Sequence, residues 1–422
     1  MENGVSGLRA EGEALGVVAD NVANVSTTGF KRQRSLFEDV LLKSGTPGGG
    51  GAGVEQTRSQ QVFTQGALAQ TGVPTDLAIS GEGFFVVQGT VNGLTSSFYS
   101  RAGQFRVDAA GFLVNPSGLR LSGRPMTADG SLAASVSALV VPTSGIPARA
   151  TGEVQISANL DAAAATSTVL FDPANPANTA NTSTAIQIFD SLGATHELDV
   201  YFQKVGDGQW TYHALTSGDE LNPQQPGTNV EVGSGTLTFT SNGALSSLTT
   251  TQPVSLDFMG ATGGQTVDFN FGSTVSGGGT GLDGTTGFSM PSGFSAQSQD
   301  GNSSGALSGV SIASNGMVEG LYTNGMRAPV GQLVLAKFRS EDGLARAGEG
   351  LWMATKESGD AALGAPASGG RGALSAGALE TSNVELGEEF VGMIQHQRAY
   401  SANSKVIATA DDMLTTLMQL KR

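Results

Sequence analysis

Three histidines are the residues of this chain best suited to metal binding or acid–base chemistry, because the chain has no cysteine. His196 and His213 fall in neighbouring segments that we expect to be strands, and Glu197 follows the first of them. Adjacent residues of a strand point to opposite faces, so His196 and Glu197 do not form a ligand pair. His396 lies in a predicted helix without a carboxylate at helical spacing, which indicates a surface or interface residue. We therefore expect neither a metal site nor a cofactor.

Other catalytic patterns are also missing from the sequence. Carboxylates occur as adjacent pairs, which solvated surfaces commonly carry and which do not indicate glycoside hydrolysis: Asp219/Glu220, Glu388/Glu389 and Asp411/Asp412. The segment SGEGFF at 80–85 opens a strand and lacks the third glycine of a dinucleotide-binding loop. The segments DGTTG and QDGNSSG contain too few acidic residues for a calcium loop. We expect no catalytic residues and a protein that is not an enzyme.

The composition favours a β-rich protein that avoids nucleic acid and membranes. Of 422 residues, 61 are glycine, and the formal net charge is −15, which argues against an anionic partner. Between Arg149 and Asp283 there are two basic and thirteen acidic residues, so most of the negative charge lies in the middle of the chain. The first residues show no basic region followed by an apolar stretch, so we expect no secretory signal peptide. We infer that the acidic middle faces water and that the ends face protein.

An amphipathic helix is predicted at the start of the chain. Apolar or small residues recur there at alternating spacings of three and four, which places them on one helical face: Val5, Leu8, Gly12, Leu15, Ala19 and Val22. The helix is expected to end before Gly29, which can adopt a positive φ. Each internal glycine weakens an isolated helix by about 1 kcal/mol relative to alanine. This helix therefore needs a packing partner.

The strongest helix prediction covers residues 386–420, where Ser382 or Asn383 is a candidate N-cap. Two neighbouring apolar stripes run along it: Leu386, Phe390, Met393, Tyr400, Ile407, Leu414 and Met418, and beside them Val406, Ala410, Met413, Leu417 and Leu420. One partner helix would leave much of this broad face uncovered. We expect the two terminal helices to pair as a coiled coil and to contact other copies of the chain. The alternative is a helix pair contained within one folded monomer.

The predicted fold class is α+β, mainly β, with nested β-rich domains between the terminal helices. Alternating apolar residues and frequent turn residues fill most of the chain from residue 72 onward, and the glycine-rich stretch 44–53 is expected to be a flexible tether. The predicted organisation has four parts: terminal helices in 1–28 with 384–422, a linker region in 29–71 with 358–383, a β-rich domain in 72–145 with 285–357, and an inserted outer β domain in 146–284.

Four segments of the chain resemble signatures of the bacterial flagellar rod and hook proteins. They are NVANVSTTGFK at 21–31, QGALAQTG with DLAISGEGFF in 65–85, YSRAGQF with DAAGFLVN in 99–115, and LETSNVEL at 379–386 with the positions that follow it. The four occur in the family's order and cover roughly the outer half of the chain. The acidic middle shows no signature of its own. Its length favours a hook-type layout over that of the shorter distal rod protein, which remains the alternative within the family.

The resemblance implies a structural subunit of the flagellar hook, located outside the cell and attached to the basal body. Such a subunit is expected to polymerise with itself into a flexible hollow helical tube, which encloses the export channel and transmits motor torque to the filament as a universal joint. The implied partners are other copies of the chain, the distal rod protein, the hook–filament junction protein, the hook cap, the flagellar type III export apparatus and the hook-length ruler. A secreted β-rich adhesin is the alternative from another class, but it would not need striped helices at both ends.

The expected assembly interface draws on both terminal segments. Its candidate residues are Val5, Leu8, Leu15, Asn21, Val22, Asn24, Gly29, Phe30, Leu386, Phe390, Met393, Ile394, Tyr400, Ile407, Leu414 and Leu417.

Overall fold

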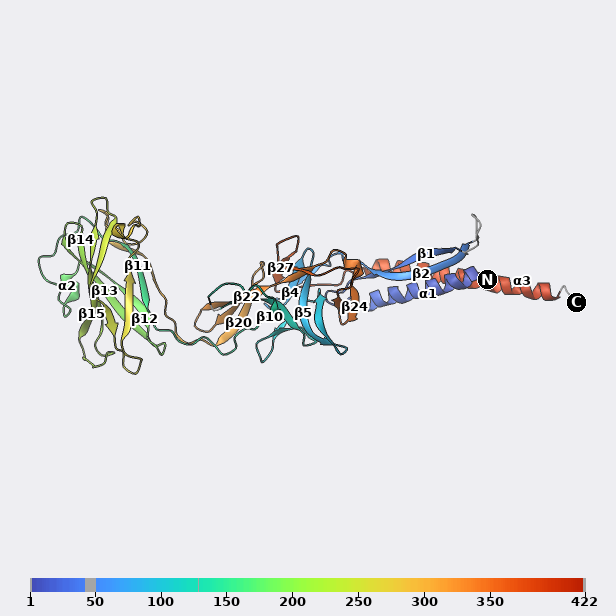
Figure 1. The fold of residues 1–422 in the computed structure, drawn as a ribbon, viewed down its shortest axis with the longest axis horizontal. Coiled ribbons are helices and arrows are strands. Elements are labelled where there is room, and N and C mark those ends of the chain that lie inside the picture. The colour runs from blue at the N-terminus through green and yellow to red at the C-terminus, as the bar shows by residue number, and fades with distance from the viewer. Residues whose placement is uncertain (1, 42–50, 128, 420–422) are drawn as a thin grey trace. The chain divides into compact units, whose positions relative to one another are not determined.

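The computed structural model of the chain describes residues 2–41, 51–127 and 129–419, excluding the side chains of 41, 51, 52 and 417. The chain divides into two compact units. Unit 1 consists of Met1–Thr143, Ser308–Leu321 and Arg327–Arg422, and unit 2 consists of Ser144–Leu307 and Tyr322–Met326. Unit 1 thus contains both ends of the chain (Figure 1).

The two long helices of unit 1 pair with each other, which confirms the predicted pairing of the terminal helices. Helices α1 (Glu2–Ala23) and α3 (Leu386–Gln419) lie side by side, and a hairpin of β1 (Gln33–Leu41) and β2 (Gly51–Gln61) packs along α1 (Figure 1). We call α1, α3 and this hairpin the arm. The hairpin was not predicted, since its strands, such as VEQTRSQQ, carry few apolar residues. Most of the predicted tether, residues 44–50, lies outside the described residues.

The body of unit 1 is a β structure built largely on one sheet of thirteen strands. Its main path runs β20 (Leu307–Ile312), β21 (Met317–Tyr322), β22 (Arg327–Leu333), β9 (Arg120–Pro125), β5 (Phe84–Val91), β6 (Leu94–Ser100), β25 (Leu351–Met353) and β24 (Ala345–Gly348). The strands off this path are β7 (Arg106–Val107), β8 (Leu113–Val114), β10 (Ser137–Ala138), β23 (Leu335–Lys337) and β26 (Ala362–Gly364).

Two short strand pairs connect this body to the arm. β27 (Ala373–Ala376) pairs with β4 (Leu77–Ser80), and β28 (Ala378–Glu380) pairs with β3 (Leu68–Gln70). These pairs fall in stretches that the sequence analysis assigned to linkers or their borders. Residues 68–70 and 373–380 are therefore ordered by strand pairing across the chain, and they hold the segment before α3 against the segment after β2.

An aromatic cluster fills the core of unit 1 beside the arm. Phe84, Tyr99, Phe338 and Trp352 are buried together, and the rings of Phe84 and Trp352 meet edge to face with centroids 5.6 Å apart. Gly103 allows the closest approach here, since a Cβ on it would lie 1.6 Å from the carbonyl oxygen of Leu77. The motifs around residues 80 and 100 therefore meet in one packed core.

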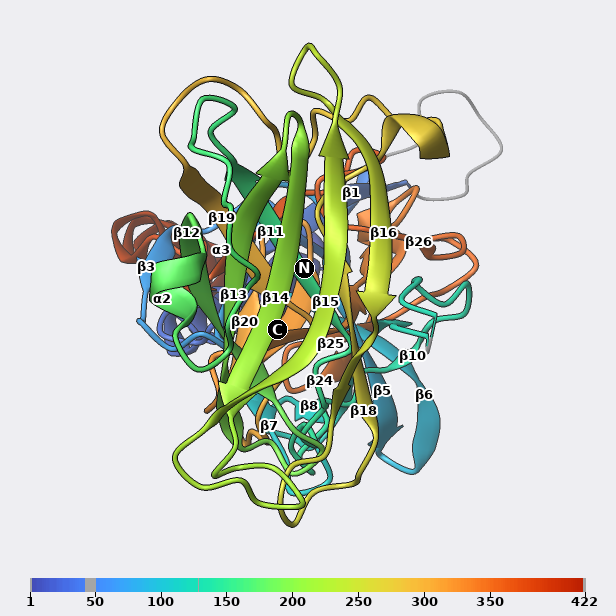
Figure 2. The same ribbon diagram turned by 90° about the vertical axis from the view of Figure 1, so that its left-hand side faces the viewer.

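Unit 2 is built from two sheets. One contains β12 (Thr182–Phe189), β13 (Thr195–Gly206), β14 (Gln209–Ser217), β15 (Asn229–Phe239) and β16 (Leu245–Gln252), which pair in this order (Figure 2). The other contains β17 (Val254–Leu256), β18 (Gln265–Asn270), β11 (Glu153–Asn159) and β19 (Gly293–Gln299). The short helices α2 (Pro176–Thr179), η1 (Val275–Gly277) and, in unit 1, η2 (Glu341–Gly343) complete the elements. The inserted domain was predicted to end at 284, whereas unit 2 continues to Leu307, because β19 pairs with β11.

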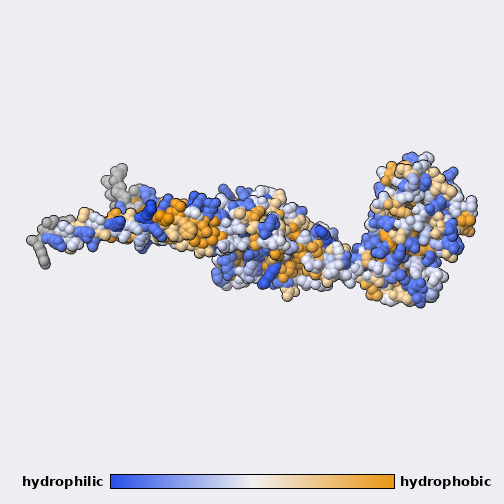
Figure 3. All heavy atoms as spheres, turned by 180° about the vertical axis from the view of Figure 1, so that it is seen from behind, coloured by the Kyte–Doolittle hydropathy of each residue, from blue (hydrophilic) through white to orange (hydrophobic). Residues whose placement is uncertain are grey.

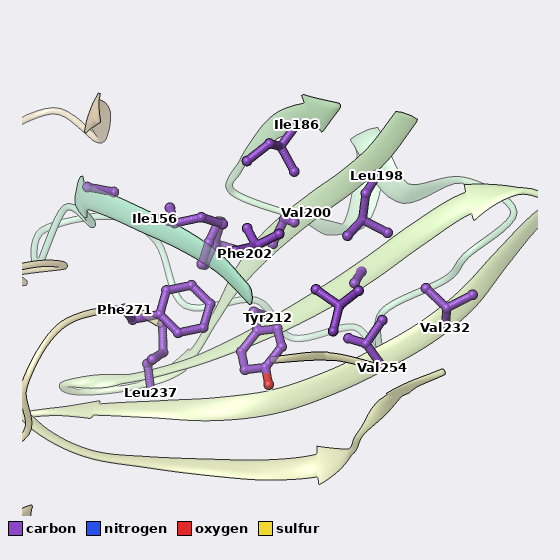
Figure 4. Close-up of a cluster of buried hydrophobic side chains, with 14 of the residues drawn as sticks. Ile156, Ile186, Leu198, Val200, Phe202, Tyr212, Val232, Leu237, Val254 and Phe271 are labelled. Carbon is purple, nitrogen blue, oxygen red and sulfur yellow. The ribbon is translucent and has the colours of Figure 1, made fainter. Parts of the chain in front are cut away.

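The core of unit 2 lies between its two sheets. Figure 4 shows Val200, Phe202 and Tyr212 of one sheet pointing toward Ile156 and Phe271 on the other side. All five are buried, and the rings of Phe202 and Phe271 lie 6.0 Å apart edge to face. Alternation along β13 thus places every second residue in the core, as the strand pattern predicted.

The core packing predicts that Phe202→Ala will destabilise unit 2 by about 3–5 kcal/mol, because it leaves a cavity among buried aromatic rings. Urea unfolding followed by Trp210 fluorescence measures this, in a Trp352→Phe background that removes the other tryptophan. The matched control is Phe288→Ala, since Phe288 is 40% exposed, and it should change stability by less than about 1 kcal/mol. Equal losses in the two variants would contradict the assignment of the core.

Candidate assembly interface

Helix α1 uses its smallest residues for packing inside the chain. Its buried residues are Gly4, Gly7, Ala10, Ala14, Val18 and Asn21. A Cβ on Gly4 would lie 3.0 Å from Cγ1 of Ile407, and a Cβ on Gly7 would lie 2.6 Å from Nδ2 of Asn403. The glycines that weaken α1 as an isolated helix therefore let the two helix backbones approach closely.

The helix pair is antiparallel. Gly4 meets Ile407 near the start of α1, whereas Asn21 near its end donates a hydrogen bond from Nδ2 to Oε2 of Glu389 over 3.1 Å. Between these points, Nδ1 of His396 lies 2.7 Å from Oε2 of Glu11. His396 is thus a residue of the helix–helix contact, and its carboxylate partner comes from the other helix.

The predicted apolar stripe of α1 faces away from this small-residue seam or lies at its edge. Val5 is 55% exposed, and Leu8, Leu15 and Val22 are half-buried. On α3, Met393 and Ile407 are half-buried. The remaining predicted residues whose side chains are described are exposed to between 41% and 50%: Leu386, Phe390, Ile394, Tyr400 and Leu414. The side chain of Leu417 lies outside the described residues.

Hydrophobic residues gather on the arm where it meets the body of unit 1 (Figure 3). Near the start of α3, the exposed apolar side chains include Phe390 and Val391, which are 50% and 56% exposed. Single exposed apolar residues are ordinary, but a contiguous stripe along two helices indicates a contact surface. The arm therefore carries a large apolar surface beyond what its own chain covers.

Of the four other predicted residues, Asn21 lies near the end of α1, and Asn24, Gly29 and Phe30 lie in the segment that follows the helix. All of them except Asn24 are buried within the chain. The side-chain amide of Asn21 makes the two hydrogen bonds that the backbone of a neighbouring strand would make. Its Oδ1 accepts from the amide of Gln33 and its Nδ2 donates to the carbonyl of Gln33, both over 2.8 Å. Asn24 donates to the carbonyl oxygen of Asp20 at the end of the helix over 2.9 Å.

Gly29 and Phe30 complete this turn against the body. Gly29 has a φ of +68°, its amide donates to the carbonyl of Glu380 over 2.8 Å, and a Cβ would lie 2.6 Å from the amide nitrogen of Ala102. Phe30 is 7% exposed. These residues fix the exit of α1, and a larger residue at 29 would meet both strain and a clash.

Glu380 forms a buried ionic centre that the sequence analysis did not identify. Its Oε1 lies 2.6 Å from Nζ of Lys31 and accepts from the amide of Gly66 over 2.9 Å, while its Oε2 lies 3.3 Å from the guanidinium of Arg101. The three charged side chains are at most 2% exposed. We call Lys31, Gly66, Arg101 and Glu380 the hub.

The hub joins the four family-like motifs, since each of its residues belongs to a different one. It contains two cations and one carboxylate. Burial lowers the pKa of Lys31, the charge of Arg101 acts in the same direction, and the attraction of Glu380 opposes both. Lys31 also donates to the carbonyl of Thr64 over 2.8 Å. The only signal in the sequence that could have indicated this contact is that each of its four residues lies in one of the family-like motifs.

Asn383 extends the hub toward α3. Its Oδ1 accepts from the amide of Arg32 over 2.7 Å, and its Nδ2 donates to the carbonyls of Val62 and Thr64 over 2.8 and 3.0 Å. Since α3 begins at Leu386, Asn383 does not cap the helix as the sequence analysis suggested. Asn383 instead holds the segment before α3 to the base of the hairpin, just before β1 and just after β2.

The two histidines of unit 2 are held by carboxylates and aromatic rings. Nδ1 of His196 lies 2.6 Å from Oε2 of Glu220, and its ring stacks on Phe258. Nδ1 of His213 lies 2.8 Å from Oε1 of Glu231, and its ring stacks on Phe171. Within the described ranges, no group of three or more His, Cys, Asp or Glu side chains is arranged to hold a metal ion.

None of the helices in the described parts of the chain combines the length and the apolar character that a membrane span requires.

Four family models match the chain in order. They are the flagella basal body rod protein model at residues 1–31, the flagellar hook protein FlgE/F/G D1 domain at 78–162, the flagellar basal body protein FlaE D2 domain at 159–302 and the flagellar basal body rod FlgEFG protein C-terminal model at 375–420. The third match covers the acidic middle, for which the sequence analysis had found no signature.

Full-length similarity to individual proteins is equally clear. The chain is 34% identical to the flagellar hook protein FlgE of Escherichia coli (strain K12), over 99% of this chain and 98% of that protein. It is also 34% identical to the flagellar hook protein FlgE of Treponema pallidum (strain Nichols), over 100% and 99%. The crystal structure of Helicobacter pylori flagellar hook protein FlgE2 shares the fold, with a TM-score of 0.53, 17% identity, and coverage of 74% of this chain and 100% of that one.

The fold and its motifs place the chain among the axial proteins of the bacterial flagellum, whose terminal segments it shares. Within that class, the chain belongs to the flagellar hook protein FlgE family, because the similarity extends over the whole length of those proteins. It is a structural subunit of the flagellar hook. This decides against the distal rod protein and leaves the adhesin alternative without support.

The hub predicts that Glu380→Gln will destabilise unit 1 by about 3–5 kcal/mol, because Lys31 and Arg101 would remain buried without a counter-charge. The measurement is urea unfolding followed by Trp352 fluorescence in a Trp210→Phe background. Glu357→Gln is the matched control, since the Arg58–Glu357 pair is exposed and 3.9 Å long, and we expect a change of at most about 1 kcal/mol. If both variants unfold at the same urea concentration, the hub does not stabilise the unit.

Proposed function

We propose that this chain polymerises with copies of itself into the flexible hollow helical tube of the hook, which encloses the export channel and transmits motor torque to the filament, and that it has no enzymatic activity. One observation carries the proposal: the seam between α1 and α3 is already filled inside the chain by small residues, while large apolar side chains of both helices remain exposed. Such a surface is stable in water only when neighbours cover it.

The predicted interface residues then fall into two groups with different roles. The apolar and aromatic residues predicted along the two helices contact neighbouring copies directly: Val5, Leu8, Leu15, Val22, Leu386, Phe390, Met393, Ile394, Tyr400, Ile407, Leu414 and Leu417. Asn21, Asn24, Gly29 and Phe30 act indirectly, since they fix the direction in which α1 leaves the body.

The parts of the chain have different roles in the tube. The terminal helices, in 1–28 and 384–422, form its inner layer, and the β-rich body of unit 1 surrounds them. Apart from the β1–β2 hairpin, the segments 29–71 and 358–383 join the arm to this body through the hub and the short strand pairs. Unit 2 forms the outer domain, whose high negative charge favours weak, hydrated contacts between copies. Such contacts let copies shift as the hook bends.

The remaining partners follow from the family. We propose that the tube joins the distal rod protein at one end and the hook–filament junction protein at the other. During growth the subunit would meet the flagellar type III export apparatus, the hook-length ruler and the hook cap. Its location would be the extracellular hook attached to the basal body.

The exposed stripe predicts that the triple variant Phe390→Gln, Val391→Gln, Ile394→Gln will remain folded but will not form tubes. Glutamine keeps the helix propensity of these positions and removes the apolar surface that neighbours would cover. Negative-stain electron microscopy of the full chain in ammonium sulfate measures tube formation. Leu170→Gln is the control, because Leu170 is 91% exposed but lies in unit 2, and it should form tubes. Absence of tubes from the unaltered chain would sink the proposal.

The outer position of unit 2 predicts that tubes survive its removal. The chain enters and leaves this unit through a short antiparallel ribbon, in which Ile146 and Gly305 exchange two hydrogen bonds of 2.8 and 3.0 Å. Residues 147–304 can therefore be replaced by a two-residue Asn-Gly turn. We expect tubes with altered curvature and bending stiffness in electron micrographs. A shortened chain that stays folded and fails to polymerise would refute this division of labour.

A further inference from the structure

Helix α3 is longer than the helix that covers it. Because Gly4 of α1 meets Ile407, and α1 begins at Glu2, residues 408–419 extend past the start of α1, as Figure 1 shows. At a rise of about 1.5 Å per residue, they span about 18 Å. We call residues 408–419 the overhang.

The overhang carries exposed apolar side chains. Met413, Leu414 and Met418 are 61%, 47% and 79% exposed. The α3 residues that face α1 include His396, Asn403 and Ile407, and the same spacing of three and four continues at 410, 414 and 418. The face of α3 that packs on α1 therefore continues beyond the start of α1, and there it carries apolar residues at all three positions. A single helix of this length is marginal in water unless it is packed.

The outer face of α1, comprising Val5, Gly12, Leu15, Gly16 and Ala19, offers a matching surface. A Cβ on Gly16 would have nothing within 4 Å, and one on Gly12 would approach only Cε2 of Tyr400, at 3.9 Å. Both glycines are exposed. Large α3 side chains lie over α1 glycines inside the chain, as Ile407 does over Gly4. The outer face repeats this arrangement, with two open glycines one turn apart.

The geometry points to a second copy of this chain as the occupant. We propose that the overhang of one copy packs on the outer face of α1 of the next copy, with methionine and leucine side chains over Gly12 and Gly16. The contact continues the α1–α3 pairing already present in the chain. Residues 1–40 and 385–422 carry net charges near zero, so the ends can approach without the repulsion expected between copies of the acidic middle. This proposal rests on the proposed polymerisation and specifies one of its contacts.

The two surfaces lie on different parts of the chain, so the contact is head-to-tail. Each copy then offers one free overhang and one free outer face. Such a contact repeats without closing unless its rotation forms a ring. It therefore explains how a single kind of subunit can continue to add at one end of a tube.

Gly16→Leu tests the contact. Leucine fits in the monomer and is a better helix former than glycine, but its side chain would occupy the space in which we place the overhang of the next copy. We expect the variant to unfold at the same urea concentration as the unaltered chain or at a higher one, and to need at least a tenfold higher protein concentration for tubes in ammonium sulfate. Gly16→Ala is the matched control and should form tubes within about twofold of the unaltered chain. If Gly16→Leu also forms tubes at the original concentration, the contact is excluded and the proposed polymerisation stands. If the unaltered chain forms none, the proposed function itself fails.

Disulfide crosslinking separates the head-to-tail contact from its alternatives, since the chain has no cysteine. Gly16→Cys is combined in turn with Met413→Cys, Leu414→Cys and Met418→Cys, and the tubes are oxidised. A ladder of dimers, trimers and larger species from at least one pair supports the proposal. Dimers formed by a single Met418→Cys variant would show that overhangs pair with each other, and tubes without a ladder from any of the three pairs would overturn the proposal.

Discussion

The arm of this protein depends on one buried carboxylate. Glu380 binds the ammonium of Lys31, the guanidinium of Arg101 and the amide of Gly66 in a place that water does not reach. A buried ion pair contributes little net stability compared with apolar packing, but the loss of one member is costly. The hub therefore acts mainly as a constraint on geometry: only one arrangement of the segment after α1 and the segment before α3 satisfies all three groups.

The arm shows how a weak helix can be suited to its position. Glycines at 4 and 7 lower the stability of α1 in isolation, yet they create the space into which Ile407 and Asn403 fit. The larger apolar residues of α1 are left for surfaces beyond the chain. Small residues of α1 thus serve contacts within the subunit, and we propose that its exposed large residues serve contacts between subunits. The small residues therefore serve the folding of the subunit, and we propose that the exposed large ones serve its assembly.

The sequence predicted the terminal helices, their pairing and the β-rich middle, because these depend on local periodicity and turn residues. It did not predict the hairpin after α1, whose strands are too polar to show the usual alternation. It predicted the apolar stripe but not that Gly4 and Gly7 would form the inner seam, since periodicity does not show which face meets which partner. The hub joins residues 31, 66, 101 and 380, and no local pattern indicates contacts over such separations. Asn383 was misassigned to a helix cap because its partners lie more than 300 residues away.

The separation of 349 residues between Lys31 and Glu380 also affects when the arm can form. Contacts between distant parts of a chain are slow to close, because the loop between them must first lose its freedom. The body of unit 1 and all of unit 2 can fold while either end is still held elsewhere. The arm contains both ends of the chain, so it cannot be complete before the last helix, α3, is available to pair with α1. The topology therefore implies that the arm, with the surface that we propose binds other copies, is the last part of the molecule to form.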